Sequence, residues 1–289
     1  MINPYNPKDV RELMSAHGIN FRKEFGQNFL MDPYVVERIA DAAGETADRT
    51  VLEIGPGIGT LTRELAARYR RVLALEIDRG LIPVLAETLA DCPNAAVLNL
   101  DAMKADLSAL LAEDFAKGPV SVCANLPYYI TTPILMKLLE CGLPFESITV
   151  MVQKEVADRL CADAGSRDYG AISVAVAYYG SAEKCFFVPA GKFLPPPKVD
   201  SAVVRIKLYK TSPYADADRD LLFRVVKAAF GERRKTLANA LSQGFNELSK
   251  DLISSCISSI GLDPGVRGER LDIHAFVDLS AALGKVLKE

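Results

Sequence analysis

The stretch that decides the fold is Val51-Leu52-Glu53-Ile54-Gly55-Pro56-Gly57-Ile58-Gly59-Thr60, an apolar run followed by a glycine-rich turn. This order predicts a buried strand, a tight turn and a helix that begins near Thr60. Glycines in such a turn let the backbone pass close to a bound ligand, because a Cβ there would collide with it. The stretch therefore predicts an α/β sheet with a ligand site at the end of one strand.

The spacing of the glycines separates two classes of cofactor. Gly55, Gly57 and Gly59 follow a GxGxG pattern, and Thr60 stands where a dinucleotide-binding turn has its third glycine. A dinucleotide also needs the helix N-terminus for its pyrophosphate, whereas S-adenosylmethionine carries no phosphate. The turn by itself is a weak signal, but its details favour S-adenosylmethionine.

On both sides of this stretch, short β-branched runs alternate with amphipathic stretches, which is typical of a parallel sheet covered by helices. Strands are expected at 50–54, 72–77, 96–100, 120–124 and 148–152, followed by strand-like segments at 184–188 and 202–208. Helices are expected to open at Asp32-Pro33, near Thr60 and at Thr132-Pro133. Five parallel strands followed by a hairpin suit a methyltransferase sheet better than a dehydrogenase sheet.

The alternation stops after Tyr209, and helical periodicity takes over. Residues 211–220 look like a polar linker, and helices are expected at 221–230, 236–241, 252–260 and 273–287. The sequence therefore predicts a Rossmann-like α/β domain over 1–210, in which 1–30 forms a cofactor or substrate segment. A small all-helical domain is predicted over 211–289.

Composition narrows the class of protein. The six cysteines lie far apart and form no CxxC pair, which argues against a zinc site and a disulfide framework. The N-terminus has no apolar signal region, and no apolar run reaches the roughly 20 residues of a membrane helix. We therefore expect a cytoplasmic protein without a metal or a membrane partner, and a monomer by default.

The net charge of −3 argues mildly against nucleic-acid binding, but a binding face needs only local charge. Two stretches are locally basic, 184–210 and 224–235, with Asp200 and Glu232 as their respective lone acidic residues. They are candidates for an RNA face, and equally for solvated surfaces.

Polar side chains follow three of the predicted strands. Glu76 ends the second strand, where a carboxylate can accept hydrogen bonds from both ribose hydroxyls. Asp101 follows the third strand and could accept from an adenine amino group or simply cap a turn. Asn125-Leu126-Pro127-Tyr128 follows the fourth. Because the carboxyl ends of parallel strands share one edge, these groups are expected to surround one site.

The segment after the fourth strand suits methylation of an exocyclic adenine amine, which is a poor nucleophile because its lone pair is delocalised into the ring. Asn125 Oδ1 and the Leu126 carbonyl could accept both N–H hydrogens and so direct the lone pair at the methyl group. Pro127 has no N–H and biases Leu126 towards an extended conformation. Tyr128 offers a face on which a flipped-out base can stack.

These motifs together resemble those of the ribosomal RNA adenine dimethyltransferases, closest to the branch that acts on two adjacent adenosines near the 3′ end of small-subunit rRNA. The resemblance covers nearly the whole chain. It also includes Phe25-Gly26-Gln27-Asn28-Phe29-Leu30, Phe193-Leu194-Pro195-Pro196-Pro197-Lys198-Val199-Asp200-Ser201 and Phe230-Gly231-Glu232-Arg233-Arg234-Lys235-Thr236-Leu237. It implies dimethylation at N6 with S-adenosylmethionine, and the small ribosomal subunit with its rRNA as partner.

The resemblance also implies roles for single residues. Cofactor contacts are implied for Asn28, Leu30, Gly55, Glu76, Asp101 and Asn125, and the glycine turn adds Gly57. Phe193 is implied as a second aromatic side chain near the target base, with a core phenylalanine as the plainer interpretation. Arg233, Arg234 and Lys235 are expected to contact phosphates, because basic charge near a helix start is otherwise disfavoured. The helical domain is therefore expected to bind RNA.

Three alternatives remain open. The chain could dimethylate one large-subunit adenosine, as macrolide-resistance enzymes do, although the Arg233 to Leu237 segment favours the small-subunit branch. It could methylate DNA adenine or a protein glutamine, but Leu126 and the Gly26 to Leu30 segment disfavour both. It could also be a ribosome-assembly factor whose binding matters more than its chemistry.

Overall fold

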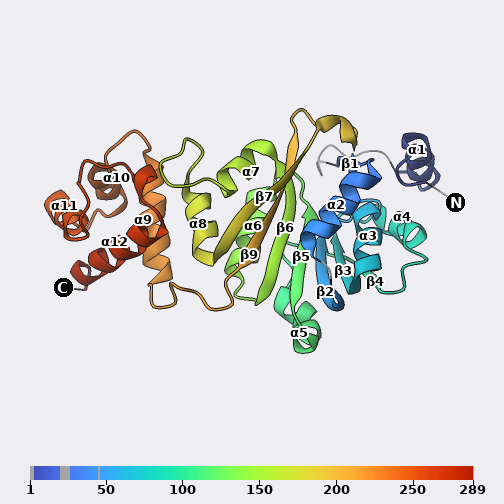
Figure 1. Ribbon diagram of the computed structural model, residues 1–289, viewed down its shortest axis with the longest axis horizontal. Coiled ribbons are helices and arrows are strands. Elements are labelled where there is room, and N and C mark those ends of the chain that lie inside the picture. Colours follow the sequence, from blue (N-terminus) through green and yellow to red (C-terminus); the bar gives the residue numbers. More distant parts are fainter. Residues whose placement is uncertain (1–2, 20–26, 45, 289) are drawn as a thin grey trace. The chain divides into compact units, whose positions relative to one another are not determined.

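The structure is a computed structural model that describes residues 3–19, 27–44 and 46–288. One large sheet in this part of the chain contains β2 (Thr46–Ile54), β3 (Tyr69–Glu76), β4 (Ala95–Asn99), β5 (Val120–Asn125), β6 (Phe145–Gln153), β7 (Gly180–Val188) and β9 (Ser201–Leu208). Their spatial order is β4-β3-β2-β5-β6-β9-β7 (Figure 1). The first five are parallel and β9 is antiparallel to β6, which confirms the predicted Rossmann-like sheet.

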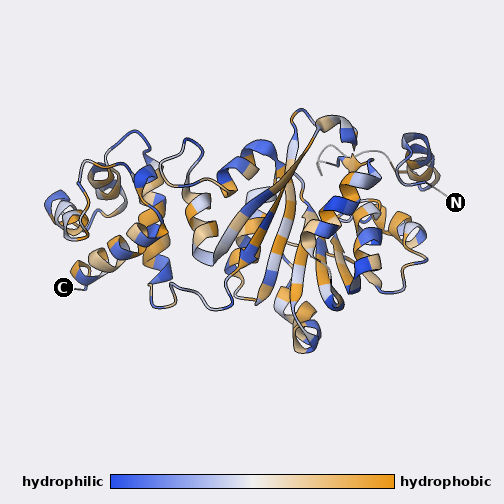
Figure 2. Cartoon of the chain, in the orientation of Figure 1, coloured by the Kyte–Doolittle hydropathy of each residue, from blue (hydrophilic) through white to orange (hydrophobic). Residues whose placement is uncertain are grey.

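The register of the parallel strands brings their carboxyl ends to one edge. Val51 of β2 pairs with Val72 of β3 and with Ser121 of β5. Asn125 at the end of β5 pairs with Met151 of β6. The strands are apolar along most of their length, as Figure 2 shows for β5 and β6, because both faces of the sheet are covered. Glu76 and Asn125 stand at the carboxyl ends of β3 and β5, at the edge where the ligand site was predicted.

Helices in the same part of the chain are α1 (Pro7–Ala16), α2 (Pro33–Ala43), α3 (Thr60–Arg68), α4 (Leu81–Thr88), α5 (Leu107–Lys117), α6 (Thr131–Glu140) and α7 (Lys154–Leu160). The start of α2 is as predicted, since Asp32 accepts the Val35 N–H at 3.2 Å. The start of α6 is earlier than Thr132, because the Thr131 hydroxyl already donates to the Pro127 carbonyl at 3.0 Å. None of the described helices has the length and apolar character that a bilayer crossing requires.

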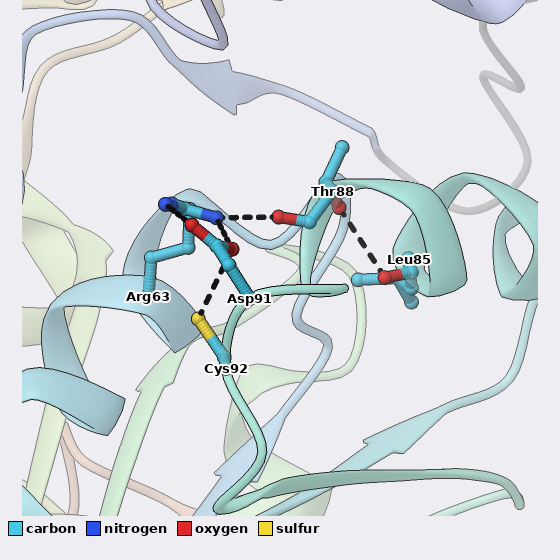
Figure 3. Close-up of polar contacts among 5 residues, drawn as sticks. All are labelled: Arg63, Leu85, Thr88, Asp91 and Cys92. Atoms are coloured by element: carbon cyan, nitrogen blue, oxygen red, sulfur yellow. Dashed lines mark hydrogen bonds and ion pairs between the residues drawn. The ribbon is translucent and has the colours of Figure 1, made fainter. Parts of the chain in front are cut away.

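A group of polar contacts around Arg63 links α3 to the end of α4 (Figure 3). Arg63 donates to the Thr88 carbonyl at 2.7 Å and to both carboxylate oxygens of Asp91, at 2.5 and 2.8 Å. The guanidinium holds the pKa of Asp91 at about 2. Because α3 begins at the glycine turn, this cluster fixes the turn against the helix that follows β3.

The chain divides into two compact units, residues 1–157 with 183–210 and residues 158–182 with 211–289. The second unit contains α8 (Ala171–Tyr179), α9 (Arg219–Gly231), α10 (Leu237–Gly244), α11 (Lys250–Ser259) and α12 (Ile273–Val286). The last four of these helices lie where helices were predicted. Residues 158–182 differ from the predicted boundary, because Tyr169, Val174 and Tyr178 belong to the same buried core as Phe276.

Candidate active site

A cavity opens where β2, β3 and β5 end, and it encloses about 1110 Å³ including the space at its open mouth. Such a volume suits a nucleoside-sized ligand together with a second reactant. The predicted site residues that line it are Asn28, Leu30, Gly55, Gly57, Glu76, Asp101, Asn125, Leu126 and Tyr128. Two further positions of the predicted segment, Phe25 and Gly26, lie outside the described residues.

The glycine turn forms one wall of this cavity. Gly55 and Gly57 have φ angles of 71° and 61°, which L side chains rarely adopt. A Cβ at Gly57 would press on the Phe29 ring at 3.1 Å, so the packing also excludes a side chain there. A Cβ built at Gly55 would instead meet only the Asn125 carbonyl, at 4.0 Å. The space beside Gly55 is therefore open to a ligand, as the glycine pattern predicted.

Glu76 lies at the end of β3 with only 5% of its surface exposed. Its carboxylate accepts the Asp78 N–H at 2.7 Å and the Gly57 N–H at 3.3 Å. Burial raises its pKa to about 7, although these two hydrogen bonds favour the ionised form. Each carboxylate oxygen can still accept a second hydrogen bond from a ligand hydroxyl in the cavity.

Asp101 caps a turn, which is one of the two roles that the sequence left open, and the contact with an adenine amino group stays a prediction. Its Oδ1 accepts the Met103 N–H at 2.9 Å and so caps a turn, and the residue also lines the cavity. Beside it, Ile77 and Leu100 line the cavity while 45% and 38% exposed. Their side chains could sandwich a flat ring. Neither residue was predicted to line the site, although each is an apolar residue next to a polar strand end.

Lys137 of α6 holds the loop that contains Asp101. Its ammonium donates to the carbonyls of Ala102, Met103 and Ala105 at 2.8, 2.9 and 2.8 Å. Three acceptors satisfy all the donors of an ammonium group. No local pattern could predict this contact, because it joins segments more than 30 residues apart, with separations of 32 to 35 positions.

The segment after β5 is anchored on two sides. The Asn125 amide donates to the Asn28 carbonyl at 3.4 Å, which leaves Oδ1 as an acceptor. The Leu126 N–H donates to the Met151 carbonyl at 3.2 Å, and the Leu126 side chain is buried. Both oxygens that were predicted to accept from an amine, Asn125 Oδ1 and the Leu126 carbonyl, therefore belong to residues that are fixed in the cavity wall.

Tyr128 is held by its hydroxyl, which lies 2.5 Å from Ser201 Oγ at the start of β9. Burial raises the pKa of this hydroxyl, so the ring stays neutral and is suited to stacking. The next residue, Tyr129, also lines the cavity and is 58% exposed.

Phe193 lies in the apolar core, and its implied place near the target base stays a prediction. It is 4% exposed and packs in the core with Val35 and Val188, and it is not among the described residues that line the cavity. The cause is a two-stranded sheet of β1 (Phe29–Leu30) and β8 (Phe193–Leu194), in which Leu30 pairs with Phe193. The plainer interpretation, a core phenylalanine, describes this placement.

A buried carboxyl that the sequence analysis did not single out, Glu53, also lines the cavity. It is 1% exposed, and its Oε2 has no hydrogen-bond partner among the described residues. Burial raises its pKa to about 8, and repulsion from Glu76 adds to this rise. An acidic residue in an otherwise apolar strand was the signal that could have identified it. Its unpaired oxygen suits a cationic or hydroxyl-bearing ligand.

The predicted RNA-binding residues lie in the second unit, in the turn between α9 and α10. Arg233 donates to the carbonyls of Arg167 and Tyr169, both at 3.0 Å, and so stabilises the unit itself. Lys235 lies 3.9 Å from Glu232, and Arg234 is exposed. The three side chains are thus in different situations, and Arg234 is the most available to an external phosphate.

Among the described residues, no group of three or more His, Cys, Asp and Glu side chains is arranged to hold a metal ion. His17 lies 2.9 Å from Glu87, and His274 lies 3.4 Å from the Tyr214 hydroxyl. Neither histidine lines the cavity.

Solved structures resemble this chain over most of its length. The crystal structure of a dimethyladenosine transferase from Plasmodium falciparum matches with a TM-score of 0.76 at 25% identity, covering 89% of this chain and 98% of that one. The crystal structure of the 23S rRNA methyltransferase ErmE matches with a TM-score of 0.69 at 28% identity, covering 89% and 100%. Both likenesses agree with the α/β fold and the added helical unit.

Curated relatives are closer in sequence. The ribosomal RNA small subunit methyltransferase A of Geobacillus thermodenitrificans (strain NG80-2) is 46% identical over 280 residues, which is 96% of each chain. The protein of the same name from Alkaliphilus metalliredigens (strain QYMF) is 46% identical over 276 residues, covering 95% of this chain and 96% of its own. The profile of a family described as ribosomal RNA adenine dimethylase matches residues 18–276. Because this match and these relatives span nearly the whole chain, the protein belongs to the ribosomal RNA adenine dimethylase family.

Proposed function

We propose that this protein transfers methyl groups from S-adenosylmethionine to N6 of two adjacent adenosines near the 3′ end of small-subunit rRNA, during ribosome biogenesis. The observation that carries the proposal is that one cavity is lined both by Gly55, Glu76 and Asp101 and by the Asn125 to Tyr128 segment. A nucleoside-type cofactor and a target base can therefore meet there. The names of the 46% identical relatives favour the small subunit.

The residues of the cavity fit this cofactor. The open space beside Gly55 admits a ligand close to the backbone, and the unpaired Glu53 carboxyl suits a positively charged group. Glu76 would accept from the ribose hydroxyls, and Ile77 and Leu100 would enclose the adenine ring, with Asp101 at its amino group. Asn28, Leu30 and Gly57 complete this half of the cavity. When bound, the cofactor supplies an electrophilic methyl group.

The other half of the cavity would orient the target amine. Asn125 Oδ1 and the Leu126 carbonyl accept its two N–H hydrogens, which favours a pyramidal nitrogen with its lone pair available. Tyr128, fixed by Ser201, stacks on the base, and such stacking contributes about 1–3 kcal/mol per base. Phe193 would take part only if it left its core position. Catalysis in this scheme rests on positioning and on exclusion of water.

No dedicated base is needed for this reaction, because the amine nitrogen becomes more acidic as it gains a methyl group. The proton can then pass to water at the open mouth of the cavity. After the first transfer one N–H remains, and either Asn125 Oδ1 or the Leu126 carbonyl can orient the nitrogen again. The same residues thus support a second methylation of the same base.

The test is to incubate the purified protein and labelled S-adenosylmethionine with unmethylated small ribosomal subunits, and to map the label by mass spectrometry. Dimethyladenosine at two neighbouring positions near the 3′ end is the expected result. Label found only on large-subunit RNA would instead favour the activity of the 23S rRNA methyltransferase ErmE, which is 28% identical. A ribosomal substrate is also the reason to expect a cytoplasmic protein, and a monomer without a metal stays the default expectation.

A role as an assembly factor is separable from the chemistry. Strains that carry a deletion or an Asn125→Ala substitution should share the loss of dimethyladenosine. If only the deletion impaired subunit maturation, binding would matter more than methyl transfer.

A further inference from the structure

The basic stretch 184–210, which lies on and between β7 and β9, has no role in the site described above, and the structure separates its members. Lys192 lies 2.5 Å from a carboxylate oxygen of Asp32, the N-cap residue of α2. Lys207 pairs in register with Ser147 near the start of β6, so it lies towards the edge of the sheet opposite the cavity. Lys184 is exposed at the middle of β7, and Phe187 lies near the end of the same strand.

Lys184 is part of a small aromatic and basic cluster. The Phe187 ring is 53% exposed, and the Lys184 and Lys154 ammonium groups lie 5.3 and 5.7 Å from its centroid. A single exposed apolar side chain is common on protein surfaces and does not by itself indicate a binding site. An exposed ring with two cations beside it is the combination that single-stranded nucleic acid recognises. We call Lys154, Lys184 and Phe187 the Phe187 cluster.

Hydrogen bonds place the Phe187 cluster next to the methyl-acceptor segment. The Lys154 N–H donates to the Asp200 carbonyl at 2.9 Å, and the Ala190 N–H donates to the Asp200 carboxylate at 2.9 Å. The ends of β6 and β7 therefore meet the start of β9. The next residue, Ser201, is the one that binds the Tyr128 hydroxyl. The cluster and the acceptor segment thus lie at the same edge of the sheet.

We propose that the Phe187 cluster binds a nucleotide that flanks the target adenosine, with its base stacked on Phe187 and adjoining phosphates held by Lys154 and Lys184. This inference rests on the proposed function, and it adds a second contact for the RNA on the first unit. It assigns a role to Lys184 of the basic stretch and none to Lys207.

The order of the strands supports an RNA contact at this place. Cofactor residues come from β2 and β3, the target base would lie over the end of β5, and β6, β9 and β7 follow on the other side (Figure 1). An adenosine that is turned into the cavity pulls its neighbours out of regular stacking, so a flanking base needs a new surface. An exposed phenylalanine provides this surface whatever the sequence of the RNA.

The stacking contact is tested with Phe187→Ala and with the ring-preserving variant Phe187→Trp. Affinity for unmethylated small subunits is measured by equilibrium binding, without any methyl transfer. Phe187→Ala should weaken binding by about 5- to 150-fold, the range for one stacked base, while Phe187→Trp restores it. The control is Tyr209→Ala, which removes another exposed aromatic residue, 41% exposed, beyond the opposite end of β9. Equal affinities for Phe187→Ala and the wild type would overturn the inference.

The phosphate contacts are tested by salt dependence. Lys154→Gln combined with Lys184→Gln should reduce the slope of log affinity against log salt by roughly 1.4, since each phosphate contact on a single strand contributes ~0.7. The matched pair Lys207→Gln and Lys210→Gln removes the same charge at the other edge of the sheet and should leave more of the slope intact. Equal slopes for the two double variants would contradict the assignment.

The identity of the occupant is tested by replacing Phe187 with the photo-crosslinking amino acid p-benzoylphenylalanine in the full chain. A crosslink to rRNA close to the methylated adenosines supports the inference, and a crosslink to a ribosomal protein or to none overturns it. Because these measurements report binding, they are independent of methyl mapping. The wild type could fail to methylate the subunit and still show the Phe187 contact, or methylate it without that contact.

Discussion

Two hydrogen bonds hold Asn125 in place, one from its own side chain and one from the backbone of the next residue. Its amide donates to Asn28, and the next residue, Leu126, is fixed to β6 through Met151. The Oδ1 acceptor therefore needs no reorganisation when a base enters. Preorganised polar groups of this kind act mainly on the chemical step.

Asn125→Ala should consequently reduce methyl transfer by about 100- to 1000-fold, the usual effect of removing one preorganised hydrogen-bonding group. The fold should persist, because Leu126 still anchors the segment. Single-turnover transfer to small subunits, with circular dichroism as the check on folding, measures the effect. Turnover close to the wild-type rate would exclude this role for Asn125.

The two buried glutamates make stability depend on pH. Their ordinary pKa is 4.5, and burial raises it to about 8 for Glu53 and about 7 for Glu76. The folded state therefore holds protons that the unfolded chain releases. Such groups stabilise fully below the unfolded pKa, and their contribution is lost as the pH rises through the folded pKa.

The unfolding free energy of the ligand-free protein should therefore fall between pH 5 and pH 8, the window set by these shifts. Glu53→Gln should flatten the profile, because the amide has no proton to lose in that range. Urea denaturation at a series of pH values measures this. Glu113→Gln, which changes an exposed glutamate of α5, should follow the wild-type profile, and an unchanged profile for Glu53→Gln would reject the explanation.

Single residues show where the sequence was informative. Glu76, Asp101 and Asn125 could be predicted because each follows a strand of a parallel sheet, so topology alone brings them together. The burial of Phe193 could not be predicted, since it depends on a pairing with Leu30, which lies 163 positions earlier in the chain. Glu53 was visible as a motif residue, but its unpaired oxygen is a property of the packed cavity.

At the scale of elements, α6 connects the two halves of the active site. It begins directly after the methyl-acceptor segment, and its Lys137 holds three carbonyls of the loop after Asp101. A movement of this helix would therefore change both the proposed base site and the adenine side of the proposed cofactor site.

Lys137→Met keeps most of the side-chain volume and removes the three hydrogen bonds. We expect cofactor affinity to fall by about tenfold or more, because three part-buried carbonyls lose a charged donor. Isothermal titration with S-adenosylhomocysteine measures the affinity, with Glu76→Ala as a variant that should also weaken binding. Lys117→Met, on the exposed end of α5, is the matched control. Equal affinity of Lys137→Met and the wild type would show that the loop holds its shape without the ammonium.

Elements with a clear period could be predicted, and those without one could not. The parallel strands and the helices at α2, α3 and α9 to α12 lie where periodicity and caps placed them. Helix α8 received no assignment, because Ala-Ile-Ser-Val-Ala-Val-Ala-Tyr-Tyr is apolar throughout and has no polar face. Because α8 was not predicted, residues 158–182 were assigned to the first domain. They belong to the second unit, since the side chains of α8 pack in its core.

At the scale of the whole molecule, the turn between α9 and α10 combines contacts that stabilise the second unit with side chains that we predict to bind RNA. Arg233 and Arg234 are neighbours, yet only Arg233 donates to the Arg167 and Tyr169 carbonyls. The basic segment predicted as one phosphate-binding unit therefore has a structural member and an exposed member.

Arg233→Gln should lower the unfolding free energy by about 1–2 kcal/mol, a value reduced for the partial exposure of the side chain. Arg234→Gln should leave stability unchanged. It should reduce the slope of log RNA affinity against log salt by about the contribution of one phosphate contact. Thermal unfolding and filter binding at several salt concentrations distinguish the two. The assignment fails if both variants show the same pair of effects.

The short β1–β8 sheet has a consequence for the order of events on the enzyme. Its strand β1 contains Leu30, which lines the cavity. Its partner β8 precedes the loop that ends at Ser201, and the Ser201 hydroxyl contacts Tyr128. We therefore predict that a ligand that stabilises one of these two paired strands also stabilises the other. By thermodynamic reciprocity, the factor by which the cofactor strengthens RNA binding must equal the factor by which RNA strengthens cofactor binding. The four paired residues of β1 and β8 would thus make each reactant an effector of the other. The enzyme would bind the cofactor, or the RNA, more weakly when the other reactant is absent.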